Sequence, residues 1–104
     1  MTMSESELQA LVVASNEHLL RFLESDLALG NTFLDIAQTE FGRGYREHGT
    51  RSMQHAAEAV SMVNKFLNRI PDSNNRDRLK ALSTDLERRI AEVERTYCEG
   101  AGAI

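Results

Sequence analysis

The chain has 104 residues, a formal charge of −4, an apolar fraction of 41% and a charged fraction of 27%. This length fits a single domain, and the composition is that of an ordinary water-soluble protein. The acidic balance argues against binding of nucleic acid or anionic lipid, and the single Pro and six Gly argue against an all-β fold, which needs many turns.

The cellular compartment is inferred from one cysteine and from the first residues. Cys98 is the only cysteine, so no disulfide can form within the chain and a reducing environment is expected. The opening residues are acidic and lack the basic region of a secretory signal, and no apolar run approaches the about 20 residues of a membrane span. The sequence therefore predicts a cytoplasmic protein that does not interact with membranes.

The first expected helix covers residues 4–41. Ser4 and Glu7 form a capping box, in which each side chain accepts a backbone hydrogen bond from the other end of the first turn. The apolar and small positions that follow keep one helical phase throughout. They are Leu8, Leu11, Val12, Ser15, Leu19, Phe22, Leu23, Leu27, Gly30, Phe33, Leu34, Ala37 and Phe41.

Two interpretations of this first segment remain open at the sequence level. It is either one continuous helix or two helices with a break near residues 15–16, where Asn16 could serve as an N-cap. The lack of Gly or Pro before Gly30 favours the continuous helix. Gly30 itself lies in phase with the apolar stripe, which predicts a close approach between two helices.

The second expected helix covers residues 45–70, after a tight reversal over 41–45 that contains two glycines. Gly49 either lies on its buried stripe or precedes a helix that begins later, at a Thr50 cap. Pro71 ends the helix. The stripe consists of Gly49, Met53, Ala56, Val60, Val63, Leu67 and Ile70.

The third expected helix covers residues 74–97, after a polar cluster at 72–75 that offers several capping residues. Its apolar positions recur at helical spacing, and the other face is charged. The apolar positions are Leu79, Leu82, Leu86, Ile90, Val93 and Tyr97. The two ends of the chain, 1–3 and 99–104, are expected to fray.

Together these elements predict an all-α fold, an up-down-up bundle of three long helices at about 4–41, 45–70 and 74–97, within one domain over 1–104. A continuous first helix would be longer than its two partners. The part from Leu8 to Leu23 would then project with an uncovered apolar stripe, and such a stripe needs a partner.

This projecting stripe predicts a small helical protein–protein interaction module that self-associates as a homo-oligomer, with another protein as the alternative partner. No catalytic constellation and no cofactor-binding motif is recognisable, so neither enzyme activity nor a cofactor is predicted. The interface candidates are Leu8, Leu11, Val12, Leu19, Phe22 and Leu23.

Short motifs resemble those of the tetratricopeptide repeat. Residues 29–33, Leu-Gly-Asn-Thr-Phe, are similar to the signature of its first helix, and Ala59, Val63, Phe66 and Pro71 follow the spacing of its second. Val63 stands where the repeat usually has an aromatic residue, the two motifs are much further apart than in the repeat, and no second copy exists. An elongated hairpin of this kind also resembles microtubule-interacting-and-trafficking domains. The resemblance implies binding of peptides or helices in a groove, and no enzyme activity.

An alternative function would use His48, His55 and Glu58 in a helical-bundle metal site or enzyme. Carboxylate and imidazole groups on one helical face can bind a divalent metal. Di-iron bundles, however, use Glu-x-x-His on two helices, whereas this chain has His-x-x-Glu once. A solvated polar face is therefore the favoured interpretation of these residues.

Overall fold

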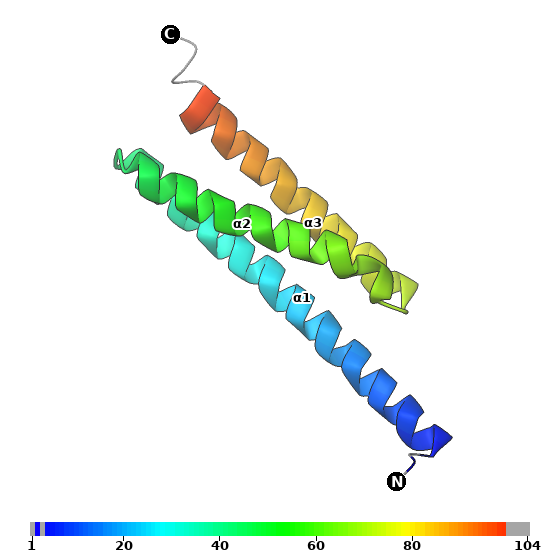
Figure 1. The fold of residues 1–104 in the computed structure, drawn as a ribbon. Helices are drawn as coiled ribbons and strands as arrows, with labels where there is room; N and C mark the ends of the chain where they lie inside the picture. The colour runs from blue at the N-terminus through cyan, green and yellow to red at the C-terminus, as the bar shows by residue number, and fades with distance from the viewer. Residues whose placement is uncertain (1, 3, 100–104) are drawn as a thin grey trace.

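A computed structural model describes residue 2 and residues 4–99 and places three α-helices. They are α1 (Glu5–Gly42), α2 (Arg46–Phe66) and α3 (Ser73–Val93), which run up, down and up (Figure 1). The described residues contain no strand. The predicted all-α, up-down-up architecture is thus confirmed, while the predicted fraying of the ends falls largely on residues 1, 3 and 100–104, outside the described part.

α1 is one continuous helix of 38 residues. The Ser4 hydroxyl caps it by accepting a hydrogen bond from the Glu7 backbone N–H at 3.2 Å. At 1.5 Å per residue the helix is about 57 Å long. The alternative with a break near residues 15–16 is wrong, because Asn16 stays inside the helix and nothing nearby interrupts the backbone ladder.

The reversal between α1 and α2 requires one left-handed residue. Gly44 has φ 84°, a conformation that costs side-chain-bearing residues about 1–2 kcal/mol. α2 then begins before Gly49, so a start at a Thr50 cap is wrong. Gly49 is buried under the ring of Phe41, whose Cδ1 would lie 2.8 Å from an added Cβ.

The turn between α2 and α3 combines a short 3₁₀ segment with a capped helix start. α2 ends at Phe66, before the predicted residue 70, and Leu67–Arg69 form one 3₁₀ turn. Asp72 then caps α3, because its carboxylate accepts hydrogen bonds from the backbone N–H groups of Asn74 and Asn75 at 2.8 and 3.1 Å. After Val93 the chain continues as a π-helical segment, Glu94–Glu99.

One apolar core lies along the axis of the bundle. Gly30 is buried where all three helices meet, since an added Cβ would lie 2.8 Å from Leu86 Cδ2 and 2.9 Å from Ala59 Cβ. The predicted close approach at this glycine is therefore confirmed. The core residues are Leu23, Leu27, Leu34, Ala37, Phe41, Met53, Ala56, Val60, Val63, Ile70, Leu79, Leu86 and Val93.

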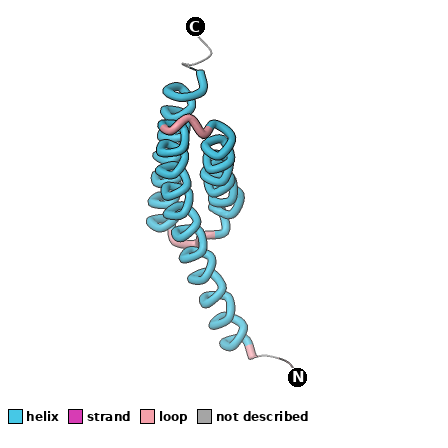
Figure 2. The backbone as a smooth tube through the Cα atoms, turned by 90° about the vertical axis from the view of Figure 1, so that its left-hand side faces the viewer, coloured by secondary structure: helices cyan, strands magenta, loops and turns pink. Residues whose placement is uncertain are grey.

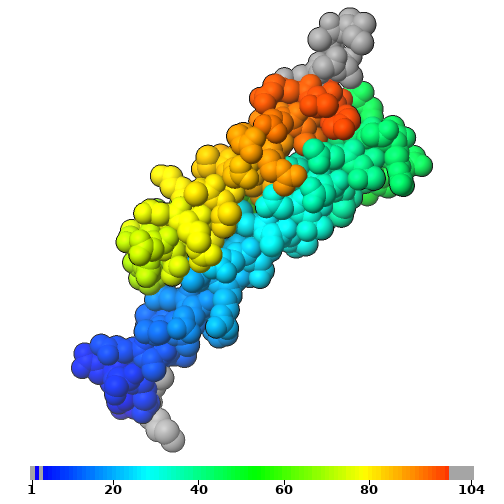
Figure 3. Space-filling view, turned by 180° about the vertical axis from the view of Figure 1, so that it is seen from behind, coloured from blue at the N-terminus to red at the C-terminus, as the bar shows by residue number. Residues whose placement is uncertain are grey.

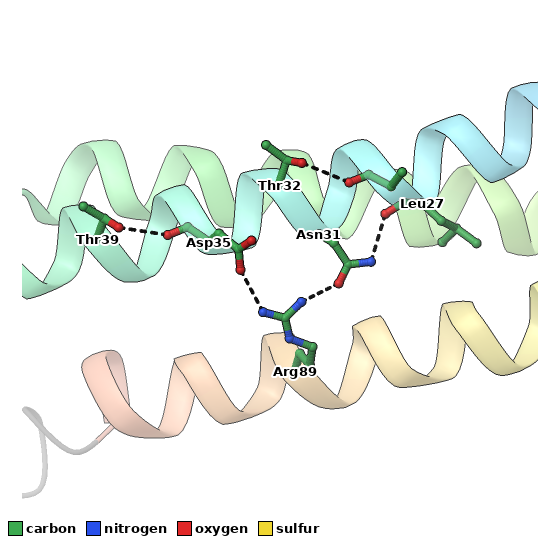
Figure 4. Close-up of polar contacts among 7 residues, drawn as sticks. Leu27, Asn31, Thr32, Asp35, Thr39 and Arg89 are labelled. Carbon is green, nitrogen blue, oxygen red and sulfur yellow. Dashed lines mark hydrogen bonds and ion pairs between the residues drawn. The ribbon is translucent and has the colours of Figure 1, made fainter.

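Two arginines fix α3 against α1 at the edge of this core. Arg89 donates from Nη2 to the carboxylate of Asp35 at 2.9 Å and from Nη1 to the side-chain carbonyl of Asn31 (Figure 4). Arg78 donates to the carboxylate of Glu24 at 2.6 Å. These charge-assisted bonds set the position of α3 along α1.

The three helices form an elongated molecule of 66 × 25 × 15 Å. The N-terminal part of α1 extends well beyond the turn that joins α2 to α3 (Figures 1 and 2). Seen from behind, this part stands clear of the other helices (Figure 3). The predicted projection of α1 is therefore present.

Candidate functional site

The projecting segment, which we define as residues 5–18 of α1, carries an exposed apolar surface. Leu8, Leu11, Val12 and Val13 keep between 48% and 57% of their surface accessible. Residues 5–15 are all exposed, and the α2–α3 turn reaches the segment only near Val13 and Asn16, which line a cavity with Ile70 and Pro71. The fold leaves these apolar side chains in water, so the segment gains from binding another surface.

The six predicted interface residues fall into three groups. Leu8, Leu11, Val12 and Phe22 are exposed, as an interface with another chain requires. Leu19 is half-buried and packs against the core of its own chain. Leu23 is completely buried in that core, so it is inaccessible to a partner and its assignment as an interface residue is corrected.

The exposed apolar surface of α1 continues beside the bundle. We call it the outer seam, a set of positions that alternate in steps of four and three residues and therefore lie along one face of the helix. Leu29 and Ile36, near its far end, are still 51% and 42% exposed. The outer seam consists of Leu8, Val12, Ser15, Leu19, Phe22, Asp26, Leu29, Phe33 and Ile36.

The outer seam lies next to the stripe that α1 buries against α2 and α3. Five of the six buried α1 residues directly follow a seam residue in the sequence, as Leu23 follows Phe22 and Leu34 follows Phe33. Successive residues of a helix point about 100° apart, so α1 has two adjacent apolar faces. In the sequence the two faces form one broad stripe, so Leu29 and Ile36 were not predicted as interface residues. The available signal was that each of them directly precedes a small residue of the buried stripe, Gly30 and Ala37.

A shallow cavity of about 190 Å³ borders the outer seam where α1 meets α2. We call it the α1/α2 groove. Phe33 forms part of its wall and stacks on the ring of His55, with centroids 4.8 Å apart. Partial burial raises the pKa of the Asp26 carboxyl above its ordinary value. The groove is lined by Asp26, Leu29, Gly30 and Phe33 of α1 and by His55, Glu58, Ala59 and Met62 of α2.

The histidines named for the alternative metal site contact different carboxylates. His55 Nδ1 lies 3.5 Å from Glu58 Oε2, whereas His48 Nδ1 lies 3.9 Å from Glu40 Oε2. Across residue 2 and residues 4–99, no three His, Cys, Asp or Glu side chains gather in a way that could hold a metal ion. His48, His55 and Glu58 thus do not form one site, and the geometry gives the alternative function no support.

No protein-family model, curated protein or solved structure matches this chain. The resemblance to tetratricopeptide-repeat and microtubule-interacting-and-trafficking hairpins therefore stays a prediction. Among the helices that the structure describes, none combines the length and hydropathy needed to cross a membrane.

Proposed function

We propose that this protein is a small helical protein–protein interaction module that self-associates through the outer seam of α1. The observation that carries the proposal is that exposed apolar side chains recur along one face of α1 from Leu8 to Ile36. Single exposed apolar side chains are common on protein surfaces, but a contiguous strip of them marks an interaction site.

The physical argument concerns what the projecting segment gains from a partner. Burying apolar surface contributes roughly 25 cal/mol per Å², and several large side chains lie on this strip. A partner would also cover a helix segment whose residues 5–15 are all exposed. The predicted lack of catalysis and the predicted cytoplasmic location belong to the same proposal.

A pair of charged variants tests self-association. Leu8→Glu combined with Val12→Glu places two carboxylates on the outer seam, and we expect the protein to become monomeric because those charges cannot be buried without partners. The control combines Ala10→Glu with Ala14→Glu, two exposed positions on the opposite side of the same segment. It should keep the oligomeric state of the unmodified chain.

The two variants are matched in that each adds two carboxylates one helical turn apart on the same segment. Molecular mass by light scattering behind a sizing column is the measurement, with circular dichroism to confirm that helix content is retained. Loss of association in both variants, or in neither, would contradict a role for the outer seam.

A further inference from the structure

The outer seam contains two polar positions, and their placement restricts how two copies could pair. Seven of its nine residues are apolar, and the exceptions are Ser15 and Asp26. Polar residues on an otherwise apolar helix seam fix the register and orientation of the pairing, because each must avoid an apolar neighbour. The partner's seam therefore has to offer a polar group opposite each of them.

A parallel pair in register does not meet this condition. It would place Asp26 against the partner's Asp26, and two carboxylates at contact distance repel each other. An antiparallel pair, in which one seam runs opposite to the other, brings different residues together. The orientation that avoids the carboxylate pair is thus the antiparallel one.

Among antiparallel registers, one matches the two polar positions with each other. When Ser15 faces the partner's Asp26, the hydroxyl can donate a hydrogen bond to the carboxylate. A shift by seven residues in either direction would place Asp26 against Leu8 or Phe22 of the partner and leave a carboxylate without a polar contact. In the matched register three further pairs are apolar, namely Leu8 with Phe33, Val12 with Leu29, and Leu19 with Phe22, while Ile36 faces Glu5 at the end of the partner's helix.

The same register brings the projecting segment to the α1/α2 groove. Its seam residues Leu8, Val12 and Ser15 are spaced by four and three residues, and they meet groove residues with the same spacing in reverse order. α2 and α3 accompany α1 as far as the cavity that Val13 and Asn16 share with Ile70 and Pro71, and the part of α1 before it extends beyond them (Figure 2). A second copy therefore fits a surface that the fold leaves open.

The flank of α1 beside the outer seam also suits burial against a helix. Its exposed positions from Leu11 to Thr32 carry no permanent charge, and they are Leu11, His18, Ser25 and Thr32. Apart from Asp26, the charged residues of this part of α1 lie on the side opposite the outer seam, and they include Glu17, Arg21 and Glu24. A partner helix on the outer seam would consequently desolvate few charged groups.

We infer that two copies of this chain pair antiparallel along the outer seam, so that Ser15 of each copy faces the partner's Asp26 and each projecting segment lies in the α1/α2 groove of its partner. This inference rests on the proposed self-association and specifies its partner, orientation and register.

Disulfide trapping between single-cysteine variants tests the register. The Cys98→Ala substitution first removes the native thiol. Ser15→Cys and Asp26→Cys are then introduced separately into this cysteine-free chain, which gives two proteins with one cysteine each. Mixed and exposed to air oxidation, they should form a covalent dimer that contains one molecule of each. Each variant alone should not cross-link, because equivalent positions would lie 11 residues, or about 16 Å, apart along the helices, beyond the reach of a disulfide.

The outcomes separate this inference from the proposed function. If Ser15→Cys cross-links by itself, or if a dimer by mass gives no cross-link in the mixture, the register is wrong while self-association stands. If the Cys98→Ala chain and the unmodified chain are both monomeric at every concentration, the proposed function fails and the inference fails with it.

Discussion

Replacing Gly30 with valine is expected to lower the free energy of unfolding by about 3 kcal/mol, the upper end of the usual cost of overpacking a core. An added Cβ at this position would lie 2.9 Å from Ala59 Cβ, a methyl group fixed to the backbone of α2. Relief therefore requires α1 and α2 to separate, which also weakens the neighbouring contacts. Urea denaturation at one fixed protein concentration measures the loss.

Gly42→Val is the matched control for this prediction. Gly42 is the last residue of the same helix, and apart from its chain neighbours and the backbone of its own helix no atom of the described residues lies within 4 Å of an added Cβ. We expect the free energy of unfolding to change by less than about 1 kcal/mol, which reflects backbone entropy alone. Equal losses in the two variants would show that close packing at Gly30 is not what stabilises the bundle.

Leu86→Ala is expected to lower the free energy of unfolding by about 3 kcal/mol, within the range for a large core residue reduced to alanine. Leu86 is completely buried, and its Cδ2 lies where α3 approaches α1 at Gly30. The truncation removes apolar contacts and leaves a cavity between the helices. The same urea titration measures the change.

The effects of Gly30→Val and Leu86→Ala on the free energy of unfolding should not be additive when the two substitutions are combined. Leu86→Ala removes one of the two close contacts that the valine of Gly30→Val would make, the one with Leu86 Cδ2, while the contact with Ala59 remains, so the double variant should lose about 1 kcal/mol less than the sum of the single losses. Leu79→Ala provides the comparison, because Leu79 is equally buried on α3 but does not border the space at Gly30. If the free energies of unfolding were additive both for Gly30→Val with Leu86→Ala and for Gly30→Val with Leu79→Ala, Leu86 and Gly30 would not share a contact.

The helices themselves could be predicted because local signals decide them. The phase of the apolar residues, the Ser4 cap and the glycines of the first reversal each act within a few residues of the chain. Which side of a helix is buried depends instead on where the other helices lie. On α3 the predicted core residue Leu82 is exposed, whereas Ser83 is buried and donates a hydrogen bond to the Asn64 side chain at 3.1 Å.

The candidate interface could likewise be predicted only in part. The length of α1 relative to its partners could be predicted, and so could the projection of an apolar segment. The sequence could not separate Phe22 from Leu23, because adjacent apolar residues belong to one broad stripe until α2 and α3 occupy part of it. Only the arrangement of the three helices shows that Leu23 is buried and that the exposed seam continues to Ile36.

The mass of the unmodified chain in solution decides whether the protein self-associates. Sedimentation equilibrium from low micromolar to millimolar concentration is the measurement. Self-association through the outer seam predicts a mass of twice 11.7 kDa that persists as the protein is diluted into the micromolar range. A mass of 11.7 kDa at every concentration would contradict it.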